Sequence, residues 1–101
     1  MRAIQVNEIT RNIKEMCIEA NHFLSADMEK TMKNAVQCEE SPLGRQILEQ
    51  LQENLRIAGN DMIPICQDTG MAVIFMEIGQ DVHFEGGSLE EAINEGVRQG
   101  Y

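Results

Sequence analysis

The chain has 101 residues, with 17 acidic and 8 basic side chains and a formal net charge of −9. This acidic balance argues against binding to a nucleic-acid backbone or to an anionic membrane surface, because both need clustered Lys and Arg. The 43% hydrophobic content is enough for a folded core. The longest uninterrupted apolar run, Met71–Met76, is far shorter than the ~20 residues of a membrane span.

The cysteine content and the first residues bear on the cellular compartment. Three cysteines, an odd count, disfavour a secreted disulfide scaffold. The first eight residues contain no apolar stretch of the kind found in secretory signals. We therefore expect a reducing, cytoplasmic location.

Helical patterns fill the first sixty residues. Apolar residues recur at the i, i+4, i+7 spacing that places them on one face of a helix. Asn7, Ser25 and Ser41 are suitable N-caps, and Pro42 fits the first position of a helix. Gly59 is expected to end the third helix, as a C′ residue. The predicted helices span about 7–24, 26–38 and 42–58.

Extended structure is expected after the third helix. Residues 71–78 predict a strand that is apolar nearly throughout, so both of its faces should be covered. A short second strand is expected at about 81–85. The two strands should form a pair, because only Gly79 and Gln80 separate them.

A last helix is expected at about 89–99. Ser88 and Glu91 have the S-x-x-E spacing of a capping box. Gly96 and Gly100 should weaken this helix, since glycine is a poor helix former. The predicted fold class is therefore α+β, with three helices in the N-terminal half, then a short strand pair and a further helix. No stop signal follows the last helix, so we expect residues 1–101 to be an incomplete piece of a larger domain.

Chemically active side chains concentrate in residues 64–70, Pro-Ile-Cys-Gln-Asp-Thr-Gly. Pro64 restricts the chain before the turn, and groups held in this way are well placed for a site. A Cys66 thiolate can bind a soft metal or a cluster. Gln67 offers a donor and an acceptor, and Asp68 can orient a hydroxyl or move a proton.

A purely structural interpretation of the same turn stays open on composition and spacing alone. Asp68 and Thr69 can bond to the turn backbone, and Gly70 can supply a positive φ. Cys66 can pack as a small hydrophobic residue.

The specific sequence of residues 64–70 carries a family resemblance. The resemblance continues through Met71–Phe75 and residues 77–83. It also includes residues 40–44, which separate the second and third predicted helices, and the last segment, 86–101. Together these segments resemble the N-terminal part of the class I, iron–sulfur fumarate hydratases. The likeness is greatest to the α subunit of the two-subunit form, a family shared with L-tartrate dehydratase α subunits, and it covers essentially the whole chain.

The resemblance implies a hydro-lyase that adds water reversibly across the double bond of a small dicarboxylate, giving malate from fumarate. Members use a [4Fe–4S] cluster held by three cysteines, with one iron open to substrate. Carried over by motif, Cys66 is one cluster ligand, and Gln67 and Asp68 contact the substrate, Asp68 in a catalytic role. Pro64, Thr69 and Gly70 shape the turn.

In this family the other two cysteine ligands lie further along the polypeptide. The implied partners are the remainder of the α subunit and a β subunit, with no nucleic acid and no membrane. Apolar surface left exposed on such a piece would favour self-association.

Two other functions compete with this hypothesis. One is a self-contained metal or redox-sensing module built from Cys17, Cys38 and Cys66. The other is a non-catalytic interaction domain. Cys17 lies on the apolar stripe of the first helix, so we expect it in the core. Cys38 lies near the end of the predicted helix 26–38, beside Glu39 and Glu40, and we expect it to be structural or incidental.

Overall fold

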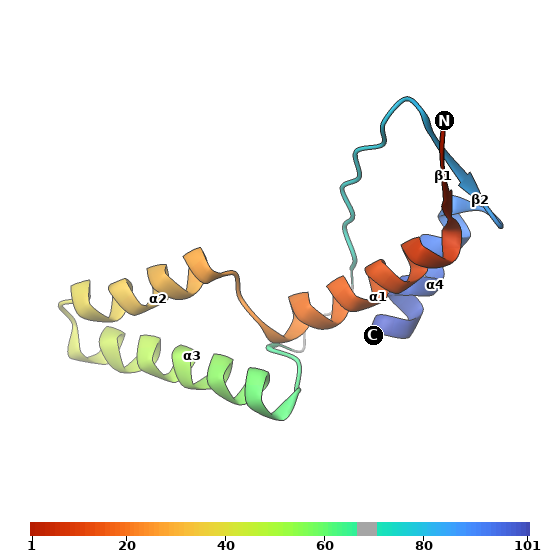
Figure 1. Cartoon of the computed structure of the whole chain (residues 1–101). Coiled ribbons are helices and arrows are strands. Elements are labelled where there is room, and N and C mark those ends of the chain that lie inside the picture. Colours follow the sequence, from red (N-terminus) through yellow and green to blue (C-terminus); the bar gives the residue numbers. More distant parts are fainter. Residues whose placement is uncertain (67–70) are drawn as a thin grey trace. The chain divides into compact units, whose positions relative to one another are not determined.

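The computed structural model describes residues 1–66 and 71–101 (Figure 1). The chain divides into two compact units, one formed by Met1–Glu19 with Asp68–Tyr101 and the other by Ala20–Gln67. The predicted α+β class is confirmed, since the chain is rich in helix and has a small sheet. In the described part of the chain, no helix is long and apolar enough to cross a membrane. The elements, in chain order, are β1 (Arg2–Gln5), α1 (Val6–His22), α2 (Ala26–Cys38), α3 (Pro42–Asp61), β2 (Val82–Glu85) and α4 (Leu89–Gly100).

The sheet consists of β1 and β2, which run parallel in the register Arg2↔Val82 to Gln5↔Glu85. Ile4 and Phe84 are register partners and both are half-buried, whereas the residues beside them are exposed. This alternation is typical of strands with one covered face. The strand predicted at 81–85 is therefore present, but its partner is β1, which was not predicted from the sequence.

The prediction of a strand at 71–78 is wrong for this structure. Residues 71–79 form no regular element and run as an extended coil before β2 (Figure 1). Every residue from 71 to 80 is exposed. An apolar run favours extended backbone, but a strand also needs a neighbouring backbone to pair its N–H and C=O groups. In the described structure, β2 pairs with β1 and the predicted strand pair does not form.

Helices α1 and α4 pack closely because α4 presents small residues to α1. Ile13 and Ala92 are only 3% and 7% exposed. A Cβ added at Gly96 would lie 2.6 Å from Ile13 Cβ and 2.7 Å from the Thr10 carbonyl oxygen. The Thr10 hydroxyl donates a hydrogen bond of 2.8 Å to the Ala92 carbonyl. The missing side chain at Gly96 thus permits the close approach of the two backbones.

The contact continues one helical turn further along. A Cβ at Gly100 would lie 2.6 Å from Cys17 Cβ. Cys17 is half-buried there, and this burial raises the pKa of its thiol. The expectation that Cys17 lies in the core is met only in part, because Cys17 packs against α4 but is not fully buried. Gly96 and Gly100, which we expected only to weaken α4, are the residues that let it pack.

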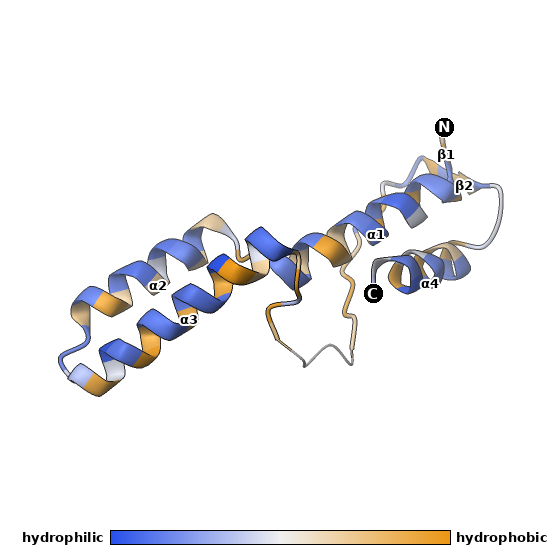
Figure 2. Ribbon diagram, turned by 90° about the horizontal axis from the view of Figure 1, so that it is seen from below, coloured by the Kyte–Doolittle hydropathy of each residue, from blue (hydrophilic) through white to orange (hydrophobic). Residues whose placement is uncertain are grey.

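Helices α2 and α3 form an antiparallel hairpin (Figures 1 and 2). Pro42 is the first residue of α3, and the Ser41 hydroxyl accepts the Gly44 N–H at 3.2 Å, as predicted. The connecting turn is held by Arg45, whose guanidinium donates to the Glu39 carbonyl at 2.9 Å. The hairpin has little core, because α2 has no buried residue and α3 has only Ala58.

The third helix ends later than predicted. It continues through Asp61, and Met62 follows in the left-handed conformation, with φ 52°. Gly59 therefore lies inside the helix and does not terminate it. A Cβ at Gly59 would lie 2.9 Å from Phe23 Cε1, so glycine is suited to this close contact.

The other helix starts are partly as predicted. Asn7 is not an N-cap, because α1 already begins at Val6. Ser25 holds the N-cap position of α2, but its hydroxyl donates a hydrogen bond to the Asp27 carboxylate in the first turn. The Ser88 hydroxyl accepts the Glu91 N–H at 3.4 Å, which confirms that half of the predicted capping box.

Candidate functional site

The structure describes only some of the predicted site residues. Pro64 and Cys66 are described, whereas Gln67, Asp68, Thr69 and Gly70 lie outside the described residues. The roles expected for those four residues stay predictions. The geometry of the site is therefore built from the segment that leads to Cys66.

This segment is fixed by hydrogen bonds to both backbone groups of Ile65. Its N–H donates to the Asn21 carbonyl at 2.7 Å. Its carbonyl accepts from the Asn54 side-chain amide at 2.9 Å. We call this pair of hydrogen bonds the Ile65 clamp. It fixes the chain one residue before Cys66.

The local structure explains why Asn21 and Asn54 can bond to Ile65. Asn21 lies in the last turn of α1, where helix carbonyls lack intrahelical partners and need another donor. The N–H of Ile63 bonds to the Ala58 carbonyl at 3.2 Å, just after the left-handed Met62, and so turns the chain back at the end of α3. Asn54, on α3, supplies a side-chain donor.

From the sequence, Pro64 is the residue expected to restrain this segment, and the roles of Asn21 and Asn54 were not predicted. A weak signal for Asn54 was present, since this amide follows Leu51 by three residues on a helix with an apolar stripe. No local pattern identifies Ile65 as its partner, because the two residues are 11 positions apart.

Cys66 has an exposed, free thiol. It is therefore not packed as a small hydrophobic residue, the arrangement required by the structural interpretation. An exposed thiol on a restrained backbone is accessible to a metal or cluster, which binds the thiolate form.

The other two cysteines have different surroundings. Cys17 is half-buried at the contact with α4, whereas Cys38 is exposed at the last residue of α2. Cys17 belongs to one compact unit, and Cys38 and Cys66 belong to the other. Within residues 1–66 and 71–101, no group of three His, Cys, Asp or Glu side chains could hold a metal ion. The described structure thus provides one candidate ligand and no complete metal site.

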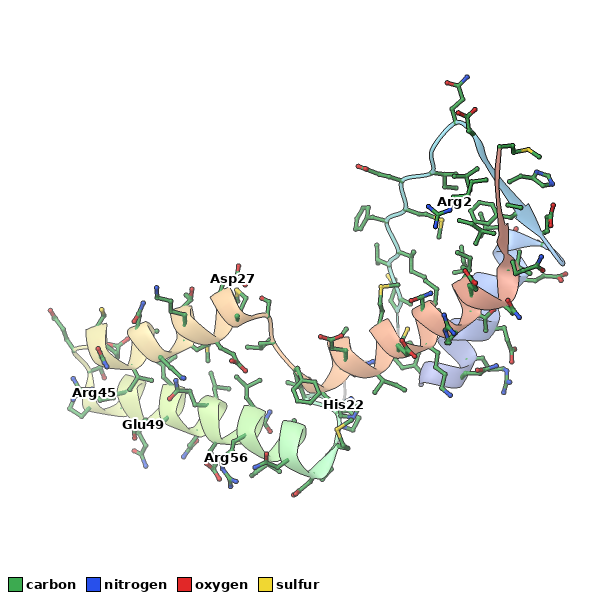
Figure 3. All side chains as sticks on the ribbon, viewed as in Figure 1. Arg2, His22, Asp27, Arg45, Glu49 and Arg56 are labelled. Carbon is green, nitrogen blue, oxygen red and sulfur yellow. The ribbon has the colours of Figure 1, made fainter. Side chains whose placement is uncertain are left out.

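A groove on the α2–α3 hairpin is separate from the predicted site. Its volume is about 390 Å³, and both acidic and basic side chains line it. Glu49 and Arg56, two of its lining residues, project from α3 (Figure 3). Pro64 and Cys66, the two predicted site residues that the structure describes, do not line the groove. Its lining residues are Glu29, Met32, Lys33, Glu49, Gln52, Glu53, Leu55 and Arg56.

Known proteins are similar in sequence to this helix-rich α+β chain, including the restrained segment before Cys66. The model of a family described as fumarate hydratase (fumerase) matches residues 10–101. A protein of Methanocaldococcus jannaschii, provisionally named L(+)-tartrate dehydratase subunit alpha, is 31% identical over 93 residues. The match covers 91% of this chain and 33% of that protein. No solved structure shows a significant match.

These comparisons identify the family of the chain. The chain belongs to the fumarate hydratase family. It spans about a third of the length of the curated relative that it matches.

Proposed function

We infer that this chain is the N-terminal segment of a hydro-lyase α subunit that reversibly hydrates fumarate to malate. The observation that carries this inference is the family match over residues 10–101, which includes the whole cysteine turn. The exposed thiol of Cys66, next to the Ile65 clamp, supports a role for this turn in a site. The rest of the α subunit and a β subunit are the proposed partners, and a reducing cytoplasm would keep the three thiols reduced.

The cofactor proposed is a [4Fe–4S] cluster, for which Cys66 is one ligand. When bound, its open iron would supply a Lewis acid for the hydroxyl and carboxylate of the substrate. The exposed thiol of Cys66 is compatible with this role, but the described residues do not provide the other ligands. We therefore expect the two remaining cysteines to come from polypeptide outside this chain.

The residues after Cys66 have proposed roles that follow from their chemistry. Gln67 would hold a substrate carboxylate or hydroxyl, because its amide both donates and accepts hydrogen bonds. Asp68 would orient the hydroxyl or move a proton. Pro64, Thr69 and Gly70 would shape the turn that presents these groups.

A second substrate is favoured by a specific observation, since the relative is named for L(+)-tartrate. Fumarate hydration and tartrate dehydration both involve a hydroxyl next to a carboxylate, so the same turn would serve either substrate. Turnover of each diacid by the complete enzyme, measured side by side, distinguishes the two. Tartrate turnover without malate formation would reassign the substrate and retain the hydro-lyase chemistry.

The main test uses substitutions in the complete enzyme. Asp68→Asn should fold and keep its iron and sulfide, yet lose most turnover, because it removes the ionisable group and retains the size of the side chain. Cys66→Ala should lose iron. Cys17→Ala is the matched control, and it should keep its iron at some cost in stability because Cys17 packs against α4.

Anaerobic reconstitution of the 101-residue chain tests the competing functions. We expect no stable cluster after desalting, because the chain has one accessible ligand in the proposed site. If the chain holds a cluster, and substitution of Cys17, of Cys38 or of Cys66 each abolishes it, the chain is a self-contained module.

Normal turnover of the complete enzyme with Asp68→Asn would remove Asp68 from the mechanism.

A further inference from the structure

The most exposed apolar part of the chain is the Met71–Ile78 segment, which follows directly on the cysteine turn. Phe75 is 93% exposed, Met71 81% and Val73 67%. The alternate residues are less exposed, with Ile74 at 36% and Met76 at 39%. Alternation of this kind is the side-chain period of a β-strand.

The backbone of the Met71–Ile78 segment lacks the partner that a strand requires. Across the described chain, no backbone hydrogen bond joins residues 71–78 to another segment. A row of unpaired N–H and C=O groups on an apolar segment is a ready template for pairing with another strand. The segment contains one charged residue, Glu77, and no proline, so its composition does not block such pairing.

The pattern of apolar residues indicates what kind of partner fits. Both faces of the segment are apolar, which is typical of a central strand with layers packed on both sides of its sheet. Pairing with the same segment of a second copy would satisfy one edge and leave both faces in water. Two copies would also bring together chains that each carry a net charge of −9.

We propose that the Met71–Ile78 segment is a central β-strand whose partner strand lies in the polypeptide that completes the α subunit. This proposal rests on the proposed function, under which residues 1–101 are one segment of that subunit. The curated relative is about three times the length matched here, so its remaining two thirds are long enough to supply both a strand and covering layers. The strand would then also support the cysteine turn from its C-terminal side.

Hydrogen exchange of the 71–78 amides tests the proposal directly. The measurement compares the complete α polypeptide with the 101-residue chain at low and high concentration. We expect these amides to exchange about 100-fold or more slowly in the complete polypeptide, because paired strands exchange through rarer opening events. In the 101-residue chain they should exchange at nearly unprotected rates. The amides of α3 should be protected in both and serve as the internal reference.

Three outcomes would overturn the proposal. Protection in the 101-residue chain that rises with concentration would show that a second copy is the partner. Protection that appears only when the β subunit is added would place the partner strand there. Fast exchange in a folded complete polypeptide would show that the segment is not a strand.

A substitution pair provides an independent test. Phe75→Asp should leave the thermal unfolding of the 101-residue chain unchanged, since Phe75 is 93% exposed there. In the complete polypeptide it should lower the protection of the 71–78 amides or the yield of folded protein. Gln80→Asp introduces the same charge just outside the segment and should do neither. Equal effects of both substitutions in the complete polypeptide would contradict the proposal.

Iron content and turnover are recorded separately, on the same complete α polypeptide assembled with the β subunit. A protein without a cluster or hydro-lyase activity, but with protected 71–78 amides, would refute the proposed function and retain the strand. A protein with a cluster and hydro-lyase activity, but with unprotected 71–78 amides, would refute the strand and retain the proposed function.

Discussion

Two helix pairs in this chain reach stability in different ways. Helices α1 and α4 approach so closely that Gly96 has no space for a Cβ, and Ile13 and Ala92 are buried between them. Helices α2 and α3 form a hairpin in which only Ala58 is buried. Large apolar side chains of α3 are left about half-exposed or more, namely Leu43 (67%), Ile47 (49%) and Leu51 (47%). An amphipathic stripe thus predicts a helix, but the small residues decide which pair packs tightly.

The largest effect is expected from Gly96→Ala. The added methyl would lie 2.6 Å from Ile13 Cβ and 2.7 Å from a backbone oxygen, so the helices must move apart. We expect a loss of about 1–3 kcal/mol in the free energy of unfolding, measured by urea denaturation. This loss should outweigh the gain of roughly 1 kcal/mol from better helix propensity.

Gly44→Ala in the other helix pair is the matched control. The three atoms nearest to the new Cβ, at 2.9–3.3 Å, all belong to the side chain of Glu39, which is flexible and can move aside. The substitution should be neutral or stabilise by up to about 1 kcal/mol. If both substitutions have the same sign, the contrast between the two helix pairs is wrong.

A smaller effect is expected from Asn54→Ala, which removes one of the two hydrogen bonds of the Ile65 clamp. The loss should be about 1 kcal/mol in the free energy of unfolding, typical of a hydrogen bond that is largely exposed to solvent. Hydrogen exchange at Ile65 and alkylation of the Cys66 thiol should both become faster, because the backbone before Cys66 is less restrained.

Asn60→Ala is the control for this change, since Asn60 is an exposed amide near the end of the same helix. It should leave the alkylation rate unchanged. An unchanged alkylation rate in Asn54→Ala would mean that the clamp does not control the position of Cys66.

The smallest effects are expected at two surface ion pairs, one on each helix pair. Hydrogen bonds from Arg98, and then Gln99, lower the pKa of Glu95 from its ordinary value of 4.5 to about 2. A hydrogen bond from Arg56 likewise lowers the pKa of Glu53. Because both carboxylates have lowered pKa values, their contribution to stability is present above about pH 4.5. For Glu95 it is lost as the pH falls towards about 2.

Arg98→Gln and Arg56→Gln should therefore each reduce stability slightly at neutral pH and converge with the unsubstituted chain in acid. The differences should shrink at high salt, because both pairs are exposed. Acid unfolding at low and high salt measures this. A large effect at one pair only would show that its carboxylate does more than make a surface contact.

The candidate site was predictable in part. The turn that includes Cys66 is recognisable because its residues are contiguous and chemically distinctive. The role of Asn54 could not be recognised from the sequence, because it depends on the position of Ile65 after the chain has turned back from α3. The exposed state of Cys66 was also undecided, since the same residue type packs well in an interior.

The sequence by itself determined the helices of this protein. The helical period predicts α1 to α4, and Ser41, Pro42 and Ser88 mark the starts of two of them, because capping uses atoms only a few residues apart. The tertiary structure decided the pairing of β1 with β2, the burial of Gly96 against α1 and the Ile65 clamp. The hydrogen bond from Thr10 to Ala92 joins residues 82 positions apart. Such contacts depend on which surfaces meet after the chain folds, and a short-range pattern contains no information about that.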